Sequence, residues 1–379
     1  MHEYKLGDIA FERKETCSVD KDNYPIVGLE HIIPEQVILT EWDQGSENTF
    51  TKFFRTGDVL FGRRRAYLKK AAVAPFDGIC SGDITVIAAK EDILSPRLLP
   101  FIIQNDMLFD YAVKMSAGGL SPRVKWQNLK DFVVVLPDME KQEELAEILW
   151  SMEYTKRAYR NMIAQTDELV KSQFIELFGR LGHDDKGWGL TTLGQSCELN
   201  PKRPKGIADD VYVSFVPMPA VSEKGHMDCS TIKPYSEVKK GFTYFAENDV
   251  LFAKITPCME NGKGAIAKGL SNGIGAGSTE FHVLRPIAGK SNPYWLYIIT
   301  MFDEFRTGAR KVMTGTGGQL RVPISYLSDY PIALPPIGLQ DRFEAIVKQS
   351  DKSKFELQKA LDELTAMQKK LMLNIFREQ

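Results

Sequence analysis

Two long segments of the chain place apolar residues at alternating spacings of three and four, with frequent charges between them. The first covers residues 139–179 and the second residues 337–376. The stripe positions are Leu145, Leu149, Met152, Tyr159, Ile163 and Val170 in the first, and Val347, Leu357, Leu361, Leu364, Leu371 and Ile375 in the second. This spacing predicts two long amphipathic helices. Pro137 precedes the first helix, Gly179 ends it, and Lys156, Ser350 and Ser353 interrupt the stripes.

The segments between these helices have shorter apolar runs, which Gly, Asp and Asn turns interrupt. In residues 1–138 the runs at 37–39, 59–61, 84–87 and 133–135 indicate β-strands. Residues 97–115 indicate an apolar helix. The same alternation returns in residues 182–336, where we expect an apolar helix from Tyr294 to about Phe305.

The second half of the chain repeats the first, at an offset of 198 residues in the best-matched stretch. Arg123-Val124 returns as Arg321-Val322, and Leu136-Pro137 returns as Leu334-Pro335. Further upstream the offset drifts, as loop insertions would cause, and Asp58-Val59-Leu60-Phe61 returns as Asp249-Val250-Leu251-Phe252. A repeat of this length predicts two whole domains built alike.

The expected fold class is α/β (α+β mixed), with two similar globular domains that contain small mixed sheets. We expect these domains at residues 1–138 and 181–336, and the long helices at residues 139–180 and 337–379. A helix of this length is a rod of roughly 60 Å, which cannot bury its stripe on one small domain. The two helices are therefore predicted to pair as an antiparallel coiled coil that separates the domains, in a pseudo-twofold internal repeat. The alternative is two unrelated surface helices.

Composition adds little about the target. The 379 residues carry a net charge of −2, which argues against DNA binding by electrostatics alone but not against recognition by one subunit of a complex. The polar start of the chain does not resemble a targeting segment, and the apolar runs are too short to cross a bilayer, so we expect a cytoplasmic protein. The five scattered cysteines contain no CxxC pair, which favours reduced thiols and no metal site.

Basic residues gather at particular places. Arg63-Arg64-Arg65 and Lys69-Lys70 enclose Tyr67 directly after the apolar run at residues 58–61, where a strand opens into a loop. Other basic runs are Lys202-Arg203, Lys239-Lys240 and Arg310-Lys311. A charge run is usually a solvated face, but the first run is placed as a binding loop would be.

Motifs for catalysis are absent from the sequence. Gly262-Lys263-Gly264 lacks the hydroxyl residue that a Walker-type phosphate loop needs after its lysine. There is no Asn-Pro-Pro-Tyr segment of the kind that amino-methyltransferases use, no GxSxG nucleophile and no HExxH metal helix. We therefore predict a non-catalytic binding protein.

The order of these elements resembles the specificity subunit of a Type I restriction-modification system. Each half has a globular segment, then Leu-Pro, then a glutamine, and then a long helix that ends in Leu-Phe or Ile-Phe. Two stretches are similar to versions of that family's target recognition domain: residues 57–67 followed by 76–82, and residues 249–263 followed by 277–281. The resemblance covers essentially the whole chain.

The resemblance implies a function and partners. Residues 1–138 and 181–336 would be target recognition domains 1 and 2, and each would read one half of a bipartite, asymmetric site in double-stranded DNA. The helices would set the spacing between the half-sites and dock two methyltransferase subunits. These partners, and not this chain, would hold S-adenosylmethionine and flip the adenine. Restriction and translocase subunits would complete the enzyme.

The candidate DNA-binding residues follow from the basic loops and the resemblance. Arginine suits guanine or phosphate, and the other polar side chains offer the mixed donors and acceptors that base reading needs. Glycines before the shared arginines would let the backbone approach DNA. The candidates are Arg63, Arg64, Arg65, Tyr67, Lys69 and Arg123 in the first half, and Lys254, Thr256, Asn261, Lys263, Ser278, Thr279, Glu280, Gln319 and Arg321 in the second.

Two alternatives remain open at this point. The chain can be read as an orphan specificity subunit that serves a DNA methyltransferase only. It can also be read as a two-domain scaffold that joins partners without binding DNA, although such a scaffold needs no basic loops at matching places in both halves. The DNA sequence recognised depends on loop geometry, which the sequence does not contain, and the sequence leaves the gap length open as well.

Overall fold

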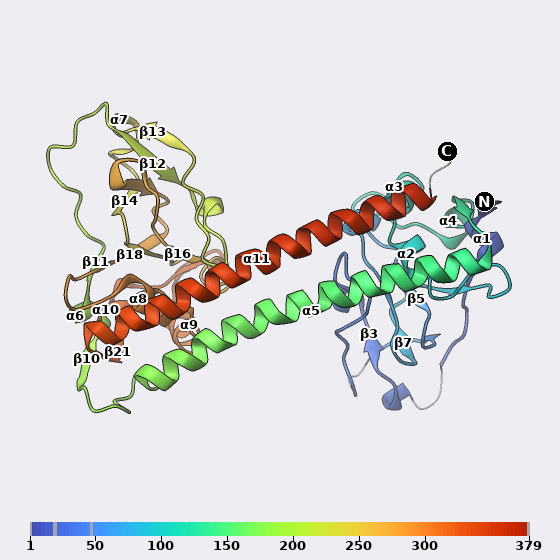
Figure 1. Ribbon diagram of the computed structural model, residues 1–379, viewed down its shortest axis with the longest axis horizontal. Helices are drawn as coiled ribbons and strands as arrows, with labels where there is room; N and C mark the ends of the chain where they lie inside the picture. The colour runs from blue at the N-terminus through green and yellow to red at the C-terminus, as the bar shows by residue number, and fades with distance from the viewer. Residues whose placement is uncertain (1, 18–20, 46–47, 377–379) are drawn as a thin grey trace. The chain divides into compact units, whose positions relative to one another are not determined.

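The computed structural model describes residues 2–17, 21–45 and 48–376, and contacts divide the chain into two compact units (Figure 1). Unit 1 comprises Met1–Met162 and Leu357–Gln379, and unit 2 comprises Ile163–Glu356. Each unit therefore contains one globular part and a stretch of both long helices. The domain limits expected from the sequence, with the helices as separate segments, stay a prediction.

Unit 1 combines small sheets with short helices. Its strands are β1 (His2–Lys5), β2 (Ala10–Glu12), β3 (Ile26–Val27), β4 (Lys52–Phe54), β5 (Val59–Gly62), β6 (Ala71–Val73), β7 (Gly78–Cys80), β8 (Ile84–Ala89) and β9 (Val133–Leu136). Its helices are α1 (Leu6–Ile9), α2 (Leu99–Ile103), α3 (Asp106–Lys114) and α4 (Trp126–Leu129), with 3-10 turns η1 (Lys21–Asn23), η2 (Leu29–His31) and η3 (Ala66–Leu68). The long helix α5 (Met139–Phe178) begins in unit 1 and ends in unit 2.

Unit 2 repeats this arrangement with longer connections. Its strands are β10 (Leu190–Thr192), β11 (Cys197–Leu199), β12 (Tyr212–Val216), β13 (Ile232–Pro234), β14 (Thr243–Ala246), β15 (Val250–Ala253), β16 (Gly264–Ile266), β17 (Ile274–Gly277), β18 (Phe281–Pro286), β19 (Thr314–Thr316), β20 (Gln319–Arg321) and β21 (Pro331–Ala333). Its helices are α6 (Leu193–Ser196), α7 (Tyr235–Val238), α8 (Pro293–Met301), α9 (Asp303–Lys311) and α10 (Ile324–Asp329), with 3-10 turns η4 (Met218–Ala220) and η5 (Ser271–Gly273). The long helix α11 (Ile337–Phe376) begins in unit 2 and ends in unit 1.

The sheets of the two units have matching strand orders. The four-stranded sheet β2-β8-β5-β6 of unit 1 corresponds to β11-β18-β15-β16 of unit 2, and the pair β1-β9 corresponds to β10-β21. The sheet β3-β7-β4, with β3 and β7 parallel, corresponds to β12-β17-β14, with β12 and β17 parallel. The prediction of a mixed fold built on an internal repeat is confirmed.

The inner strands β5 and β15, which we call the central strands of their units, are buried on both faces of their four-stranded sheets. In β5, Val59 and Phe61 pack with α2 and α3, whereas Leu60 packs in the core beneath the three-stranded sheet. In β15, Phe252 packs with α8 and α9, and Leu251 packs on the opposite face. Because strand side chains alternate between faces, a strand with two buried faces needs a continuous apolar run. This explains the repeated Val-Leu-Phe.

The two long helices pack antiparallel within each unit. In unit 1 the Lys156 ammonium of α5 donates to Gln368 of α11, and Met372 joins the core cluster of Leu149. In unit 2 Phe178 of α5 packs edge-to-face on Phe343 of α11. The predicted antiparallel pairing is confirmed in both units. Ile375, expected on the second stripe, has a side chain outside the described residues.

Three expected elements differ in the structure. Residues 97–115 form two helices because the Asn105 side chain accepts from the Met107 N–H and caps α3. The helix expected from Tyr294 to Phe305 ends at Met301, since Phe302 is extended and precedes α9. Residues 37–39 are not a strand, and Ile38 makes only an isolated bridge to Val73.

Candidate nucleic-acid interface

Each expected basic loop leaves the central strand of its unit. Residues 63–70 connect β5 to β6, and residues 254–263 connect β15 to β16. The double-sided burial of β5 and β15 makes these strands firm supports for the loops that follow them. We name loop cluster 1 as residues 63–70, 81–83 and 117–124 of unit 1, and loop cluster 2 as residues 254–263, 278–280 and 314–322 of unit 2.

In loop cluster 1 a second segment runs antiparallel beside the three arginines. The Arg63 N–H donates to the Asp83 carbonyl at 3.0 Å, and the Arg63 carbonyl accepts from the Val124 N–H at 2.9 Å. The Arg65 N–H donates to the Pro122 carbonyl at 2.8 Å, and Arg64 bridges Arg123. These bonds bring Arg123 to the basic loop, although roughly 60 residues of chain separate them.

Loop cluster 2 has the same backbone bonds with different side chains. The Lys254 N–H donates to the Glu280 carbonyl at 2.9 Å, and the Lys254 carbonyl accepts from the Val322 N–H at 2.9 Å. The Thr256 N–H donates to the Leu320 carbonyl at 3.0 Å. Ile255 bridges Arg321, as Arg64 bridges Arg123. The two clusters are therefore equivalent positions of the repeat.

An arginine and a carboxylate form an ion pair at the same place in both clusters. Arg123 donates from Nε and Nη2 to the Asp83 carboxylate at 2.7 and 3.2 Å. Arg321 donates from Nε and Nη2 to Glu280, with shortest distances of 3.0 and 2.8 Å. These hydrogen bonds lower the pKa of Asp83 and of Glu280 below their ordinary values, so both carboxylates are ionised near neutral pH. Each pair is a two-pronged contact of the planar guanidinium.

The other candidates of the first half lie on the basic loop with different environments. Arg64 donates from Nε to the Ser121 hydroxyl at 2.5 Å, and its Nη1 lies 3.5 Å from Asp83. Arg65 has a left-handed backbone (φ 53°), and its side chain and that of Tyr67 are exposed. Lys69 donates to Asp106 of α3 at 2.6 Å.

The other candidates of the second half differ from one another in hydrogen bonding and in exposure. The Thr256 hydroxyl donates to the Gly318 carbonyl at 2.8 Å, which joins the two segments of loop cluster 2. The Ser278 hydroxyl accepts from the Glu280 N–H at 3.2 Å. Lys254 and Lys263 are half-buried, whereas Asn261, Thr279 and Gln319 are exposed. The structure thus gathers the candidates of each half in one loop cluster, and among them Lys69 has its ammonium engaged by Asp106 of α3.

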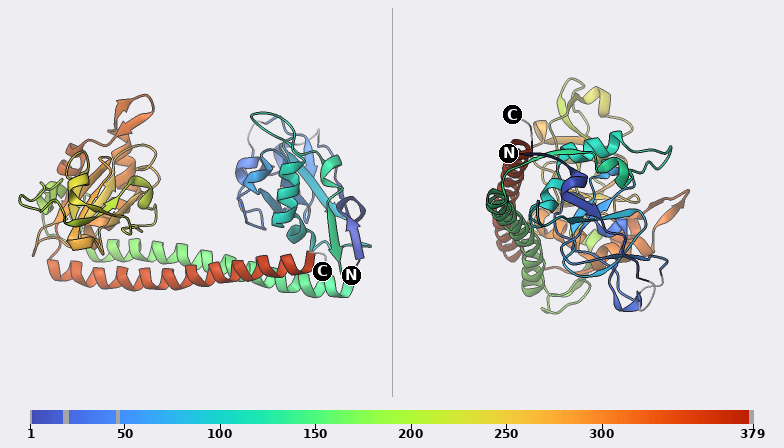
Figure 2. Two further views of the ribbon diagram at one scale, coloured as in Figure 1. Left: turned by 90° about the horizontal axis from the view of Figure 1, so that it is seen from above. Right: turned by 90° about the vertical axis from the view of Figure 1, so that its right-hand side faces the viewer.

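The β19–β20 hairpin carries Gln319 and Arg321 and projects from unit 2 on the side away from the helices (Figure 2). Thr316 pairs with Gln319, which leaves a two-residue turn at Gly317-Gly318 with φ of 64° and 78°. Positive φ at both central positions favours glycine and matches the twist of a tight hairpin. The expected glycine loop is therefore a narrow hairpin whose backbone can approach a ligand closely.

Two residues that support the loop clusters were not predicted from the sequence. Asp83 orients Arg123, but no spacing rule connects residues so far apart in the chain. Arg306 of α9 is buried and donates to the carbonyls of Met259 and Gly262, which holds the loop that carries Asn261 and Lys263.

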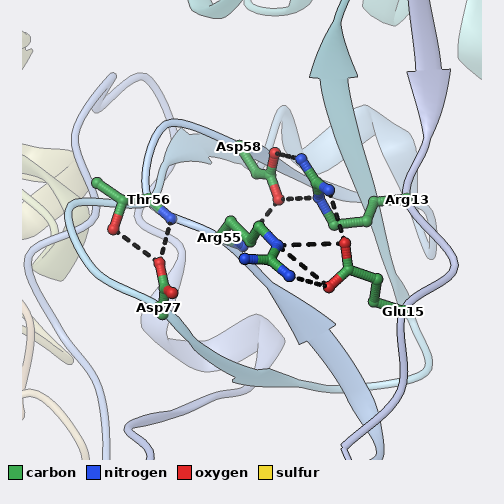
Figure 3. Close-up of polar contacts among 6 residues, drawn as sticks. All are labelled: Arg13, Glu15, Arg55, Thr56, Asp58 and Asp77. Carbon is green, nitrogen blue, oxygen red and sulfur yellow. Dashed lines mark hydrogen bonds and ion pairs between the residues drawn. The ribbon is translucent and has the colours of Figure 1, made fainter.

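A buried carboxylate anchors the start of each central strand. Asp58 accepts from Arg13 Nε and Nη2 at 2.7 and 3.0 Å, and Glu15 joins Arg13 to Arg55 beside it (Figure 3). In unit 2 the corresponding Asp249 accepts from Arg285 at 2.8 and 2.7 Å. These arginines are engaged inside the fold. The ion pairs of Arg13 and Arg285 are supports for β5 and β15 and lie outside the loop clusters.

Other kinds of site receive no support from the described part of the chain. Within residues 2–17, 21–45 and 48–376, no group of three or more histidine, cysteine or carboxylate side chains is arranged to hold a metal ion. No helix in those ranges has the length and apolar character to span a membrane. Burial raises the pKa of the Cys80 and Cys197 thiols to about 12, so neither is a reactive thiolate.

Comparison with known sequences identifies relatives of both halves. The family described as "Type I restriction modification DNA specificity domain" matches residues 1–163 and 185–365. The specificity subunits of the Type I restriction enzymes EcoEI and EcoAI of Escherichia coli are 40% and 41% identical over 188 and 196 residues, or 47% and 48% of this chain. These stretches cover 31% and 33% of those proteins, so the matched region spans about a third of the relatives' length.

Solved structures share the fold along the whole chain. The S subunit of a Type-I restriction-modification system from M. genitalium is similar with a TM-score of 0.57 at 11% identity, covering 100% of this chain and 96% of that chain. A chain from a structure of type I R-M complex assembly is similar with a TM-score of 0.55 at 19% identity, covering 99% and 97%. Since the family matches most of the sequence in both halves, this chain belongs to the Type I restriction-modification DNA specificity family.

Proposed function

We propose that this chain is the sequence-specific DNA-recognition subunit of a Type I restriction-modification complex. Each target recognition domain reads one half of a bipartite, asymmetric DNA site through its loop cluster. The observation that carries the proposal is the equivalence of the two clusters, which place cationic and polar side chains on the same backbone frame after β5 and β15. A protein with two equivalent binding surfaces suits a target with two parts.

The chemistry of the clusters fits DNA. Arg65 and Tyr67 are exposed beside Arg64 and Arg123 in loop cluster 1, a setting for phosphates and guanine edges. Loop cluster 2 presents Lys254, Lys263 and Arg321 with amide and hydroxyl groups, which suits mixed base edges. Since the side chains differ on one frame, the two clusters read different sequences, which makes the whole site asymmetric.

The chain acts without catalysing a reaction itself. We propose that two methyltransferase subunits dock on the helix pair, hold S-adenosylmethionine and methylate adenine, and that restriction and translocase subunits complete the cleaving enzyme. Membership in the specificity family supports this division of labour. A net charge of −2 supports it as well, because partners must then supply positive surface for tight DNA binding.

A base-resolution map of methylated adenines tests the proposal. We expect cells that carry this gene with its methyltransferase to show methylation at one bipartite motif, and cells that lack this gene to lose that motif entirely. Cleavage of unmethylated DNA would in addition identify restriction partners, and its absence would identify a methylation-only subunit. An unchanged map after deletion would contradict DNA recognition and favour the scaffold alternative.

The helix pair is proposed to set the gap between half-sites. One heptad inserted into both helices, near Tyr159 and near Leu357, keeps the stripes in register and lengthens the pair by about 10 Å. At ~3.4 Å of duplex axis per base pair, the methylated motif should gain a few base pairs of gap while its half-sites stay the same. A single-helix insertion is the control, and it should abolish activity because the stripes no longer match. An unchanged gap with full activity in the double insertion would contradict the ruler.

A further inference from the structure

We propose that Arg123 and Arg321 are the guanine-reading residues of their half-sites, and that Asp83 and Glu280 are the positioning residues that hold them. The proposal rests on the proposed function, DNA recognition, and assigns one guanine in each half-site to one arginine. Its basis is the ion pair that recurs at equivalent positions of both loop clusters. The arginine-rich run Arg63-Arg64-Arg65 has no counterpart of its kind in loop cluster 2, where Lys254-Ile255-Thr256 stands.

The geometry of the pairs leaves one edge of each guanidinium available. Arg123 uses Nε and Nη2 for Asp83, and Arg321 uses Nε and Nη2 for Glu280. A guanidinium has five N–H donors in one plane, so a side-on carboxylate leaves the Nη1 donors and one Nη2 donor. In Arg321, one Nη1 donor also contacts the Gln319 carbonyl, at 3.4 Å. The remaining Nη1–Nη2 edge is the one that makes a two-pronged contact.

In each ion pair the arginine is more exposed than its carboxylate partner. The side chains of Arg123 and Arg321 are 45% and 41% exposed, whereas those of Asp83 and Glu280 are 20% and 23% exposed. The carboxylates therefore sit deeper and the arginines face outward. An arginine fixed in advance loses less side-chain entropy when it binds, which favours recognition of one geometry over loose attraction to phosphate.

Guanine is the base that fits this edge. Its major-groove side presents two acceptors, O6 and N7, at the spacing of the two guanidinium donors, and no other base presents two acceptors there. The backbone frame also limits how far either arginine moves, because Arg123 and Arg321 bridge Arg64 and Ile255. One guanine in each half-site is thus assigned to one arginine.

The test uses the full complex with its methyltransferase subunits and a library of randomised DNA sites. We expect Arg123→Lys to reduce the preference for guanine at one position of one half-site by roughly 5- to 150-fold, and Arg321→Lys to do so in the other half-site. Lysine keeps the charge and loses the planar fork. Asp83→Asn should weaken the same position as Arg123→Lys, and the double variant should lose no more than Arg123→Lys alone.

A change in the DNA gives a second measurement that does not depend on variant folding. In the unaltered complex, 7-deazaguanine at the assigned position lacks the N7 acceptor and should weaken binding. An Arg123→Ala complex, which has no donor at that position, should be insensitive to that change. A uniform loss of affinity at every sequence, with a shallower salt dependence and unchanged base preferences, identifies phosphate contacts and overturns the assignment. Loss of preference for a base other than guanine overturns it too.

Arg180 supplies the matched control. It makes the same side-on pair with Asp185, with Nε and Nη2 at 3.0 and 2.9 Å from the carboxylate, but lies in the turn after α5 and outside both loop clusters. Arg180→Lys should leave every base preference unchanged, and an equal change there would overturn the inference. If the unaltered complex itself shows no base preference, the proposed function fails. If it is specific and neither Arg123→Lys nor Arg321→Lys changes a preference, this inference alone fails.

Discussion

The helix pair is packed with different chemistry in the two units. In unit 2 Phe174 and Phe178 of α5 meet Phe343 of α11 edge-to-face, with ring centroids 5.5 and 5.2 Å apart. In unit 1 the corresponding seam contains a charged group, since the buried Lys156 donates to Glu153 at 2.8 Å and to Gln368 at 2.7 Å. The aromatic seam stabilises the helix pair by burying apolar surface. The buried ion pair adds little net stability and mainly favours one packing arrangement of the two helices.

The loop clusters differ in a related way. Loop cluster 1 is short and rich in arginine, with η3 between two left-handed residues, Arg65 and Lys69. Loop cluster 2 is longer, and the buried Arg306 braces it through the carbonyls of Met259 and Gly262. Backbone bonds and strand burial keep the duplicated frame, whereas the side chains of the seam and most side chains of the loops are replaced. The arginine–carboxylate pair is the side-chain contact that recurs in both loop clusters.

Removal of the aromatic seam should have the largest effect on stability. Phe343 is fully buried between Phe174 and Phe178. Phe343→Ala should lower the free energy of unfolding by about 3–5 kcal/mol through lost burial and the cavity left behind. Urea unfolding followed by circular dichroism measures this. Phe355→Ala on the same helix is the control, because Phe355 is 67% exposed and should change stability by less than ~0.5 kcal/mol. Equal costs would show that the rings do not support the seam.

In the polar seam of unit 1, one substitution should lower the free energy of unfolding, whereas a matched double substitution should restore it. Glu153→Ala leaves the Lys156 ammonium buried without its carboxylate and should cost about 3 kcal/mol, near the low end for broken buried pairs because Gln368 still accepts from Lys156. Glu153→Leu with Lys156→Met should restore or raise stability, since an apolar pair has no desolvation cost. Urea midpoints decide this. Glu144→Ala, which breaks an exposed pair with Lys141, should leave unfolding almost unchanged.

A double variant less stable than Glu153→Ala would mean that the polar seam is itself a source of stability, and that the contrast between the two seams is wrong. The oligomeric state of the double variant and its adenine methylation with the partner subunits then test whether the two helices still pack in one arrangement. We expect the unfolding transition to stay cooperative.

Much of the fold could be predicted because periodicity records burial directly. The stripes of α5 and α11 and the apolar runs of β5 and β15 are visible in one dimension, since their spacing follows from helix and strand geometry. The places where the shorter helices are interrupted were not predicted. The break at Asn105 comes from one side-chain cap, and the break at Phe302 from one extended residue, within apolar stretches that look continuous.

The candidate site was predictable in part. The loops after β5 and β15 were placed correctly because each follows an apolar strand and is basic or polar. Asp83 and Arg306 were missed because their roles arise from bonds across 40 and more residues, which depend on how strands pair. Which side chains touch DNA stays a prediction, because residue spacing in the sequence does not distinguish a base contact from a phosphate contact.

Alanine substitutions in one loop cluster should weaken recognition of one half-site and leave the other unchanged. Arg63, Arg64 and Arg65 replaced together by alanine should weaken one half-site, by about 1–3 kcal/mol for each arginine that forms a two-pronged hydrogen bond with a base. Lys254 and Lys263 replaced by alanine should weaken the other. Since Arg64 is held by Ser121 and Arg65 is exposed, Arg65→Ala should account for most of the salt dependence in the first set. Binding of the full complex to sites altered in one half measures this.

The matched control is Lys239→Ala, a lysine of unit 2 that pairs with Asp209 outside the loop clusters. It should leave both half-sites unchanged. Equal weakening of both half-sites by either loop set would show that the clusters bind phosphate without regard to sequence, and the proposed division between them would then be wrong.

The smallest expected effect is a pH dependence confined to unit 2. His282 of β18 is buried, with Nε2 2.9 Å from the Val322 carbonyl and Nδ1 3.2 Å from the Asn200 amide nitrogen. The carbonyl requires a proton on Nε2, so neutral Nδ1 accepts from Asn200. Protonation would place two donors face to face. The corresponding position of unit 1 is Thr85, which does not titrate.

Burial lowers the pKa of His282 below its ordinary value, so the unfolded chain binds a proton more readily than the folded chain. The stability that neutral His282 contributes is therefore present above the unfolded pKa of about 6.5 and is lost as pH falls through the folded pKa. We expect the free energy of unfolding of the intact chain to fall between about pH 7 and pH 5, by up to ~1.4 kcal/mol for each pH unit that separates the two pKa values. His282→Gln keeps a donor for Val322 and should flatten this dependence. Replacement of the exposed His226 by glutamine should not, and equal flattening by both variants would show that the buried imidazole is not the group responsible.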